Sequence, residues 1–213
     1  MSKLKQIKDL GIIYDEKFTF VPHVNDLISA ALRMLGFIIR NSKHFFNANT
    51  LILLFNAFVR SKLEYGSIIW YPIYRCHNQS LEAVQRRFLK YLCYREDNVY
   101  PERGIQYSFL LNRFGITSLQ VRRVCACIAF LYGLMHNRID CSMLLSSLNI
   151  LVPRLTTRST QFFYCDQIKN NVCCRSPIYM MCNNFNLISG LCDINCDSLK
   201  QICTTICNHL PTP

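Results

Sequence analysis

The chain has 213 residues, of which 51% are hydrophobic and 17% are charged. This balance excludes an intrinsically disordered chain and suffices for the core of one domain or two small ones. Lysine and arginine number 24 against 13 acidic residues, and the net charge of +11 is spread along the chain, which excludes a basic tail as its source. A folded basic protein favours a polyanionic partner, with nucleic acid ahead of a membrane surface; a basic surface without a specific partner is the alternative.

The N-terminal segment does not have the pattern of a secretory signal, because Met1–Lys8 is polar and basic and no apolar core follows it. The longest apolar runs, Leu51–Val59 and Val124–Met135, are shorter than the ~20 residues that span a bilayer. The 13 cysteines fit a reducing compartment, where cysteine acts as a small buried hydrophobe. We therefore expect an intracellular protein, cytoplasmic or nuclear, that is neither secreted nor inserted in a membrane.

The N-terminal part of the sequence predicts a β-hairpin and three helices. The hairpin has strands at 10–14 and 18–20 with a turn at 15–17, and the helices cover 22–41, 47–71 and 80–94. Pro22 suits the first turn of a helix, and either Asn47 or Asn49 can cap the second one. Pro72 ends that second helix.

The C-terminal part follows a polar break at 95–103, which is the best candidate boundary between subdomains. Beyond the break, the hydrophobic pattern predicts a short strand at 161–165 and helices at 105–112, 118–136, 141–148, 178–187 and 199–208. Ser118 and Asp197 are the expected caps of the second and last of these helices. The predicted fold class is mainly α: a short N-terminal β-hairpin, then a helical bundle, then a smaller and mostly helical C-terminal region.

Several blocks of the sequence occur in an order known from one family. They are Lys8–Asp15 with Phe18–Phe20 and His23-Val24, Ala30–Arg40, Phe58–Ser67 with Trp70 and Pro72, Leu81–Leu89, Leu119–Arg123, Arg154, Arg158, Ser176–Ile178 and Asn184–Asn186. Together they resemble the C-terminal part of the reverse transcriptase, an RNA-directed DNA polymerase, of jockey-like non-LTR retrotransposons. One short block would carry little weight, but the ordered series covers nearly the whole chain.

The resemblance implies a division of the chain and a role for its parts. Residues 1–95 would hold the end of the polymerase palm and the thumb, and residues 96–213 would be the C-terminal extension of the retrotransposon polyprotein. Leu10 and Gly11 would lie in the primer-grip hairpin. The helices after the hairpin would form the thumb, which holds the template–primer duplex.

The carboxylates needed for polymerisation are missing. Nucleotide transfer by the two-metal mechanism requires paired carboxylates that hold two Mg²⁺ ions. In the family that the sequence resembles, they come from a Tyr/Phe-Ala-Asp-Asp hairpin and an earlier Asp, and this sequence has no Asp-Asp pair. The nearest analogues, Asp15-Glu16 and Glu96-Asp97, fit a turn and a linker. We expect no catalytic residue, metal site or cofactor, with the catalytic hairpin encoded upstream of Met1; the intact parent would need Mg²⁺.

Nucleic-acid binding does not need the palm, because a thumb holds an RNA–DNA duplex by its phosphates and not by its base sequence. The candidate contacts are the basic side chains of the predicted thumb: Arg33, Arg40, Lys43, Arg60, Lys62, Arg86, Arg87 and Lys90. The last three fall within one helical turn and can form a cluster opposite an apolar stripe. The alternative is that all of these residues are solvated faces of amphipathic helices.

Two residue pairs admit two interpretations each. Arg122-Arg123 either binds phosphate or forms ion pairs with acids such as Glu102. Trp70-Tyr71 either stacks on bases or packs at the end of a helix, and we favour packing.

The C-terminal cysteines raise a third function. Cys192, Cys196, Cys203 and Cys207 form two Cys-x3-Cys pairs, with Cys182 and His209 close by, and four thiolates can bind zinc. The spacing of four favours core packing on one helix face. The principal alternative to nucleic-acid binding is an inert relic or a helical domain that self-associates through apolar surface exposed where a palm once packed.

Overall fold

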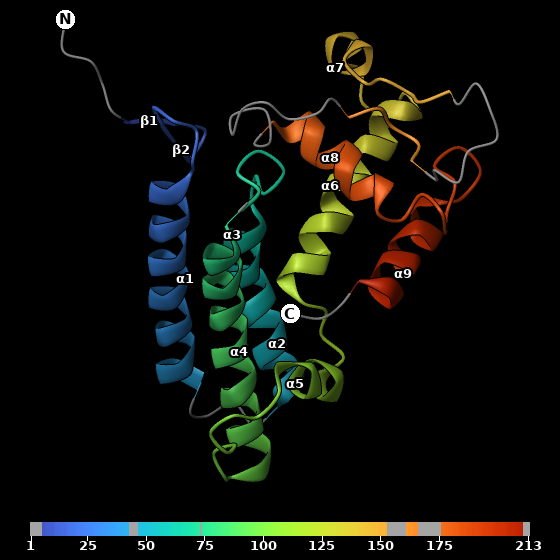
Figure 1. Cartoon of the computed structure of the whole chain (residues 1–213). Coiled ribbons are helices and arrows are strands. Elements are labelled where there is room, and N and C mark those ends of the chain that lie inside the picture. Colours follow the sequence, from blue (N-terminus) through green and yellow to red (C-terminus); the bar gives the residue numbers. More distant parts are fainter. Residues whose placement is uncertain (1–5, 43–46, 73, 153–160, 166–175, 211–213) are drawn as a thin grey trace, which may run out of the picture. The chain divides into compact units, whose positions relative to one another are not determined.

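The computed structural model describes residues 6–42, 47–72, 74–152, 161–165 and 176–210 (Figure 1). The described residues are mainly helical and begin with a two-stranded antiparallel hairpin, as the sequence predicts. They form two compact units, one from Met1–Ser67 and Pro72–Gln120 and the other from Ile68–Tyr71 and Val121–Pro211. The division at 95–96, which follows the family resemblance, separates the chain at a different point and stays a prediction.

The first unit consists of the hairpin and a group of packed helices. Its elements are β1 (Gln6–Asp9), β2 (Ile12–Asp15), α1 (Val21–Asn41), α2 (Ala48–Phe55), the π-helical segment η2 (Asn56–Arg60), α3 (Ser61–Glu64), α4 (Arg75–Asp97) and α5 (Tyr107–Phe114). Helix α1 packs against α2, η2, α3 and α4, and α5 packs against α4 (Figure 1).

The hairpin turns at Leu10-Gly11, not at 15–17 as the sequence predicts. Asp9 pairs with Ile12, and the two turn residues have φ angles of 45° and 85°. Positive φ at both central residues is the geometry of a tight hairpin turn, and Gly11 adopts it without steric cost. The predicted turn residue Asp15 instead closes the connection to α1, because its carboxylate accepts hydrogen bonds from the backbone N–H of Phe20 at 2.7 Å and the hydroxyl of Thr19 at 2.9 Å.

The core of the first unit is built from amphipathic helices. Helix α1 buries Val24, Ala31, Leu35 and Ile38 at helical spacing. The rings of Phe55 on α2 and Phe88 on α4 stack with their centroids 4.1 Å apart. The helix predicted at 47–71 instead ends at Glu64, and Gly66, with φ of 61°, lies in the turn that follows.

A buried carboxylate on α4 fixes the chain where it leads from α5 into the next helix, α6, which covers Leu119–Met135. Glu82 accepts hydrogen bonds from the Tyr107 hydroxyl at 2.6 Å and from the backbone N–H groups of Leu119 and Gln120 at 3.3 and 2.6 Å. Gln85 donates to the Tyr107 hydroxyl and to the Thr117 carbonyl, both at 3.0 Å. The Glu82 carboxylate thus satisfies N–H groups at the positive end of a helix, a stabilising position for an anion.

The second unit contains most of α6 together with α7 (Ser142–Ser146), α8 (Pro177–Asn186) and α9 (Leu199–His209). Its core combines Ile128 and Leu131 of α6 with Phe163, Phe185 and other buried side chains. Residues 161–165 form an isolated bridge from Phe163 to Ile150 where the sequence predicts a strand.

Side-chain amides and hydroxyls fix the loops of this unit. The Asn186 side chain accepts from the backbone N–H groups of Phe162 and Phe163 at 3.1 and 2.9 Å and donates to the Phe163 carbonyl at 2.8 Å. The N-terminal cap of α9 is Ser198, in a capping box with Gln201, and not Asp197 as predicted.

Candidate nucleic-acid interface

A hollow between α1 and α3 brings together two basic residues that the sequence predicts to contact nucleic acid. It is lined by Ala30, Arg33, Met34 and Phe37 of α1 and by Lys62 of α3, and its volume is about 320 Å³. The α1 residues lie at positions i, i+3, i+4 and i+7, so they share one face. Arg33 and Lys62 are exposed, and within the described ranges neither pairs with a carboxylate. The hollow therefore presents two available positive charges beside apolar side chains.

Phe37 and Arg40 continue this face toward the C-terminal end of α1. Phe37 is 56% exposed, and Arg40 is also exposed. The Arg40 guanidinium lies alongside Gly36, with Nη1 3.4 Å from the point where a Cβ on that glycine would stand. An exposed aromatic ring is thus placed between two cations on one helix. We call Arg33, Phe37, Arg40 and Lys62 the α1–α3 basic face.

The predicted cluster on α4 is present as a group of side chains opposite the buried stripe. Arg86 and Arg87 are exposed, and Lys90 is half-buried. Arg86 already has an internal contact, because its guanidinium lies over the Tyr107 ring at 4.8 Å from the centroid. Arg87 is exposed as well and, among the described residues, has no such ring contact.

The remaining predicted contacts differ in their surroundings. Arg60 is half-buried on η2 and takes part in an interaction within the chain. Lys43 lies outside the described residues. The predicted primer-grip residues Leu10 and Gly11 form the hairpin turn, where the Tyr65 hydroxyl donates to the Leu10 carbonyl at 3.0 Å. That bond joins the turn to the segment just after α3.

The acidic pairs considered as analogues of a metal site have structural partners. Burial alone would raise the pKa of the Asp15 carboxyl, but its hydrogen bonds from Thr19 and Phe20 outweigh burial and lower it. Glu96 and Asp97 lie at the end of α4, not in a linker, and both contact Arg113, which binds Asp97 through both guanidinium nitrogens at 2.7 and 2.6 Å. No group of three or more His, Cys, Asp or Glu side chains in the described part of the chain is arranged to hold a metal ion.

The interpretation of Arg123 as a surface contact to phosphate is wrong, because this side chain is fully buried. It lies in the second unit, where its charge lowers the pKa values of Tyr71 and Cys127, although burial outweighs it and raises both. Trp70 is also buried, and Tyr71 is largely buried, as the packing interpretation of this pair expects.

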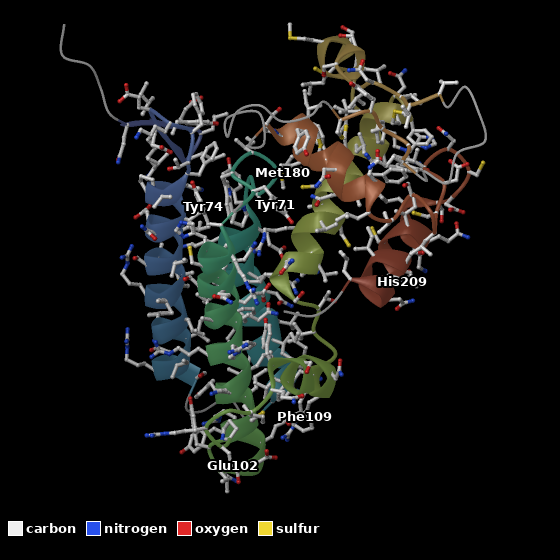
Figure 2. The ribbon with its side chains drawn as sticks, viewed as in Figure 1. Tyr71, Tyr74, Glu102, Phe109, Met180 and His209 are labelled. Atoms are coloured by element: carbon white, nitrogen blue, oxygen red, sulfur yellow. The ribbon has the colours of Figure 1, made fainter. Side chains whose placement is uncertain are left out.

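The zinc hypothesis fails on the arrangement of the described cysteines. Cys203 and Cys207 of α9 lie beside Cys125 of α6, whereas the Cys192 thiol donates to the Ile188 carbonyl at 3.4 Å. Burial, with the neighbouring thiols acting in the same direction, raises the pKa of the Cys125 thiol. His209 is exposed at the end of α9 (Figure 2).

Sequence reasoning missed Phe37 as a member of the site. A signal was present, because Phe37 lies between Arg33 and Arg40 and outside the Leu35/Ile38 stripe that α1 buries. The meeting of α1 with Lys62 of α3 depends on tertiary packing and has no such signal.

Comparison of the chain with protein-family models, with curated proteins and with solved structures finds no match. Among the described helices, none is by itself long and apolar enough to cross a membrane, and α5 and α6 meet that test only jointly, as a bent pair.

Proposed function

We propose that this chain binds nucleic acid without sequence preference through the α1–α3 basic face. The observation that carries the proposal is the hollow in which Arg33 and Lys62, from different helices, are both exposed and unpaired with carboxylates in the described ranges. Exposed cations of this kind bind phosphate oxygens and release counterions from the polyanion, which makes binding sensitive to salt. The role is binding and not polymerisation, because the sequence has no paired aspartates.

The family resemblance supplies the context of this proposal. We infer that the chain represents the thumb and C-terminal extension of a jockey-like non-LTR reverse transcriptase. A thumb recognises an RNA–DNA hybrid by the spacing of its phosphates, and the helices α1, α3 and α4 of the first unit carry all the described candidate contacts except Arg60 on η2. The net charge of +11 supports a polyanionic partner of either kind, RNA or hybrid duplex.

Fluorescence anisotropy with a labelled RNA–DNA hybrid tests the proposal. We expect weak binding whose logarithmic affinity falls linearly with the logarithm of salt concentration. Replacing both Arg33 and Lys62 by Ala is expected to reduce the steepness of that line by about 2, because each lost phosphate contact reduces it by about 1. Replacing Arg87 by Ala on α4 measures whether the site extends beyond the α1–α3 basic face.

Lys200→Ala is the matched control, because Lys200 is an exposed lysine on α9 in the second unit. It removes one positive charge from the chain without touching the α1–α3 basic face, so the salt dependence should stay at the wild-type value. Absence of any anisotropy change at low salt would contradict the proposal. An equal effect of Lys200→Ala for each charge removed would mean that net charge, and not this face, governs binding.

A second candidate function is self-association through the hairpin. Ile7, Leu10 and Phe18 are 58%, 81% and 49% exposed, so apolar side chains on and just after the hairpin face solvent. Exposed apolar side chains gathered in one place mark interaction surfaces. Within the intact parent, this is where the resemblance would place the palm.

Size-exclusion chromatography with light scattering tests this candidate. Wild-type chain is expected to elute as a dimer or larger, and the double variant Ile7→Thr/Leu10→Asn as a monomer. Asn suits position 10, because it tolerates the positive φ that Leu10 adopts there. A monomeric wild-type chain at high concentration would exclude self-association.

A further inference from the structure

The α1–α3 basic face has an apolar component that binding to duplex phosphates does not use. Ala30, Met34 and Phe37 contribute apolar surface to the hollow, while Arg33 and Lys62 supply its charge. A duplex offers phosphates and sugars along its outside and keeps its bases stacked inside. Its outer surface therefore leaves the Phe37 ring without a matching partner.

An unpaired nucleobase matches this combination of groups. Every base has a flat π-face that stacks on an aromatic side chain, and proteins that bind single strands combine such rings with basic grooves. Along α1, Arg33 lies about 6 Å before Phe37 and Arg40 about 4.5 Å after it, at a rise of about 1.5 Å per residue. Cations on both sides of the ring can hold the phosphates that flank one base.

We propose that the hollow between α1 and α3 receives an unpaired nucleobase on the Phe37 ring, with the neighbouring phosphates at Arg33, Arg40 and Lys62. The preferred ligand is single-stranded nucleic acid, or the single-stranded stretch beside a duplex, over a fully paired duplex. This inference rests on the proposed nucleic-acid binding and specifies its ligand class. A protein partner would require an apolar segment to fill the hollow, and the basic residues around Phe37 favour a polyanion instead.

The test compares a thymidine oligonucleotide, which does not pair with itself, with a hairpin duplex of equal phosphate number. The single strand is expected to bind more tightly than the duplex at the same salt concentration. Phe37→Ala should weaken binding of the single strand about tenfold or more and weaken duplex binding much less, because stacking of one base contributes roughly that factor and a duplex offers no unpaired base. Phe37→Leu keeps apolar area without a π-face and should resemble Phe37→Ala.

Two further variants serve as rescue and control. Phe37→Trp should keep single-strand affinity, and its added indole fluorescence should be quenched on binding, a signature of stacking that a structural role would not produce. Phe109→Ala is the matched control, because Phe109 on α5 (Figure 2) is 55% exposed and does not line the hollow. Circular dichroism of each variant checks that the helices are intact.

The outcomes separate this inference from the function on which it rests. Equal affinity for single strand and duplex, lowered by Arg33→Ala/Lys62→Ala but not by Phe37→Ala, would overturn the inference and leave phosphate binding in place. Absence of binding to either ligand would overturn both. A loss of affinity in Phe109→Ala as large as in Phe37→Ala would also overturn the assignment of the base to this hollow.

Discussion

The two units each fix a loop with one half-buried or buried polar side chain, but the two side chains differ in charge. In the first unit the Glu82 carboxylate accepts two hydrogen bonds from N–H groups at the start of α6 and one from the Tyr107 hydroxyl of α5. In the second, the neutral Asn186 amide both accepts and donates to the backbone of Phe162 and Phe163. Hydrogen bonds to a charged carboxylate contribute more to stability than hydrogen bonds to a neutral amide, so removing the carboxylate should cost more than removing the amide. The first unit should therefore depend more strongly on its single residue.

The two units also differ in where they place their Lys and Arg side chains. The first has 16 Lys and Arg residues against 9 acids, and the second has 8 against 4, so both are basic. The first presents Arg33 and Lys62 at a hollow, whereas the second buries Arg123 and places Arg138 over the Tyr132 ring at 5.3 Å. The net charge of a unit is therefore a poor guide to where its binding surface lies. The exposure of each Lys and Arg side chain decides whether it can contact a ligand.

Glu82→Ala should have the largest effect on stability. The substitution leaves the Tyr107 hydroxyl and two N–H groups of α6 without their acceptor, and we expect a loss of about 3 kcal/mol in the free energy of unfolding. Urea unfolding followed by far-ultraviolet circular dichroism measures it. Glu102→Ala is the control, because Glu102 is exposed (Figure 2). Equal stability of the two variants would mean that the buried carboxylate does not organise the first unit.

Asn186→Ala should lower the free energy of unfolding by a smaller amount, about 2 kcal/mol, and should destabilise the second unit. The only tryptophan, Trp70, belongs to that unit, so its fluorescence reports unfolding there. We expect the fluorescence transition to move to lower urea, while Asn208→Ala, an exposed change on α9, leaves it in place. If Glu82→Ala moved the Trp70 transition as far as Asn186→Ala does, the two units would unfold together and the contrast between them would not hold.

The sequence predicts helices α1 and α6 well and the hairpin poorly. Helix α6 covers Leu119–Met135, and the predicted range is 118–136. The two agree closely because apolar residues recur at the helical period along the whole segment. The hairpin strands are short, and residues 12–15 suit a strand whether the hairpin turn precedes them, as observed, or follows them, as predicted. The correct turn requires positive φ at Leu10, a residue that seldom adopts it.

The sequence suffices to name the basic residues of the candidate site, but not to predict how they are arranged. Arg33, Arg40 and Lys62 follow from composition and from the resemblance. Their placement around one hollow needs the packing of α1 on α3, which no local pattern encodes. The burial of Arg123 was missed because charged residues are assigned to the surface by default.

The pH dependence of stability offers a finer test, at His23 beside the hairpin. Burial lowers the pKa of His23 below its usual 6.5, with Lys8 acting in the same direction and Asp26 opposing it. Between the two values the unfolded chain binds more protons, so stability falls as pH drops below 6.5. Asp15, whose pKa is lowered from 3.8, keeps its contribution above that pH and loses it only at lower pH.

His23→Gln should make the free energy of unfolding depend less on pH in this range, because glutamine does not titrate. Its side-chain oxygen can accept the hydrogen bond that the Ile13 N–H donates to His23 Nδ1 at 3.4 Å. Urea midpoints measured across the pH range below 6.5 give the slope for each protein. His209→Gln, at an exposed position, should leave the slope unchanged. An unchanged slope in His23→Gln would assign the acid sensitivity to another group.

Arg113→Ala should have the smallest effect on stability, although Arg113 forms ion pairs with two carboxylates of the first unit. Its guanidinium contacts Asp97 and Glu96, but all three side chains are 30–45% exposed, so water competes for each charge. The measurable change is local: hydrogen bonding to Arg113 lowers the Asp97 pKa, and the substitution should return that pKa toward 3.8 in a carboxyl NMR titration. A destabilisation as large as that of Glu82→Ala would contradict the ordering by burial, because an exposed contact between α4 and α5 would then matter as much as a buried one.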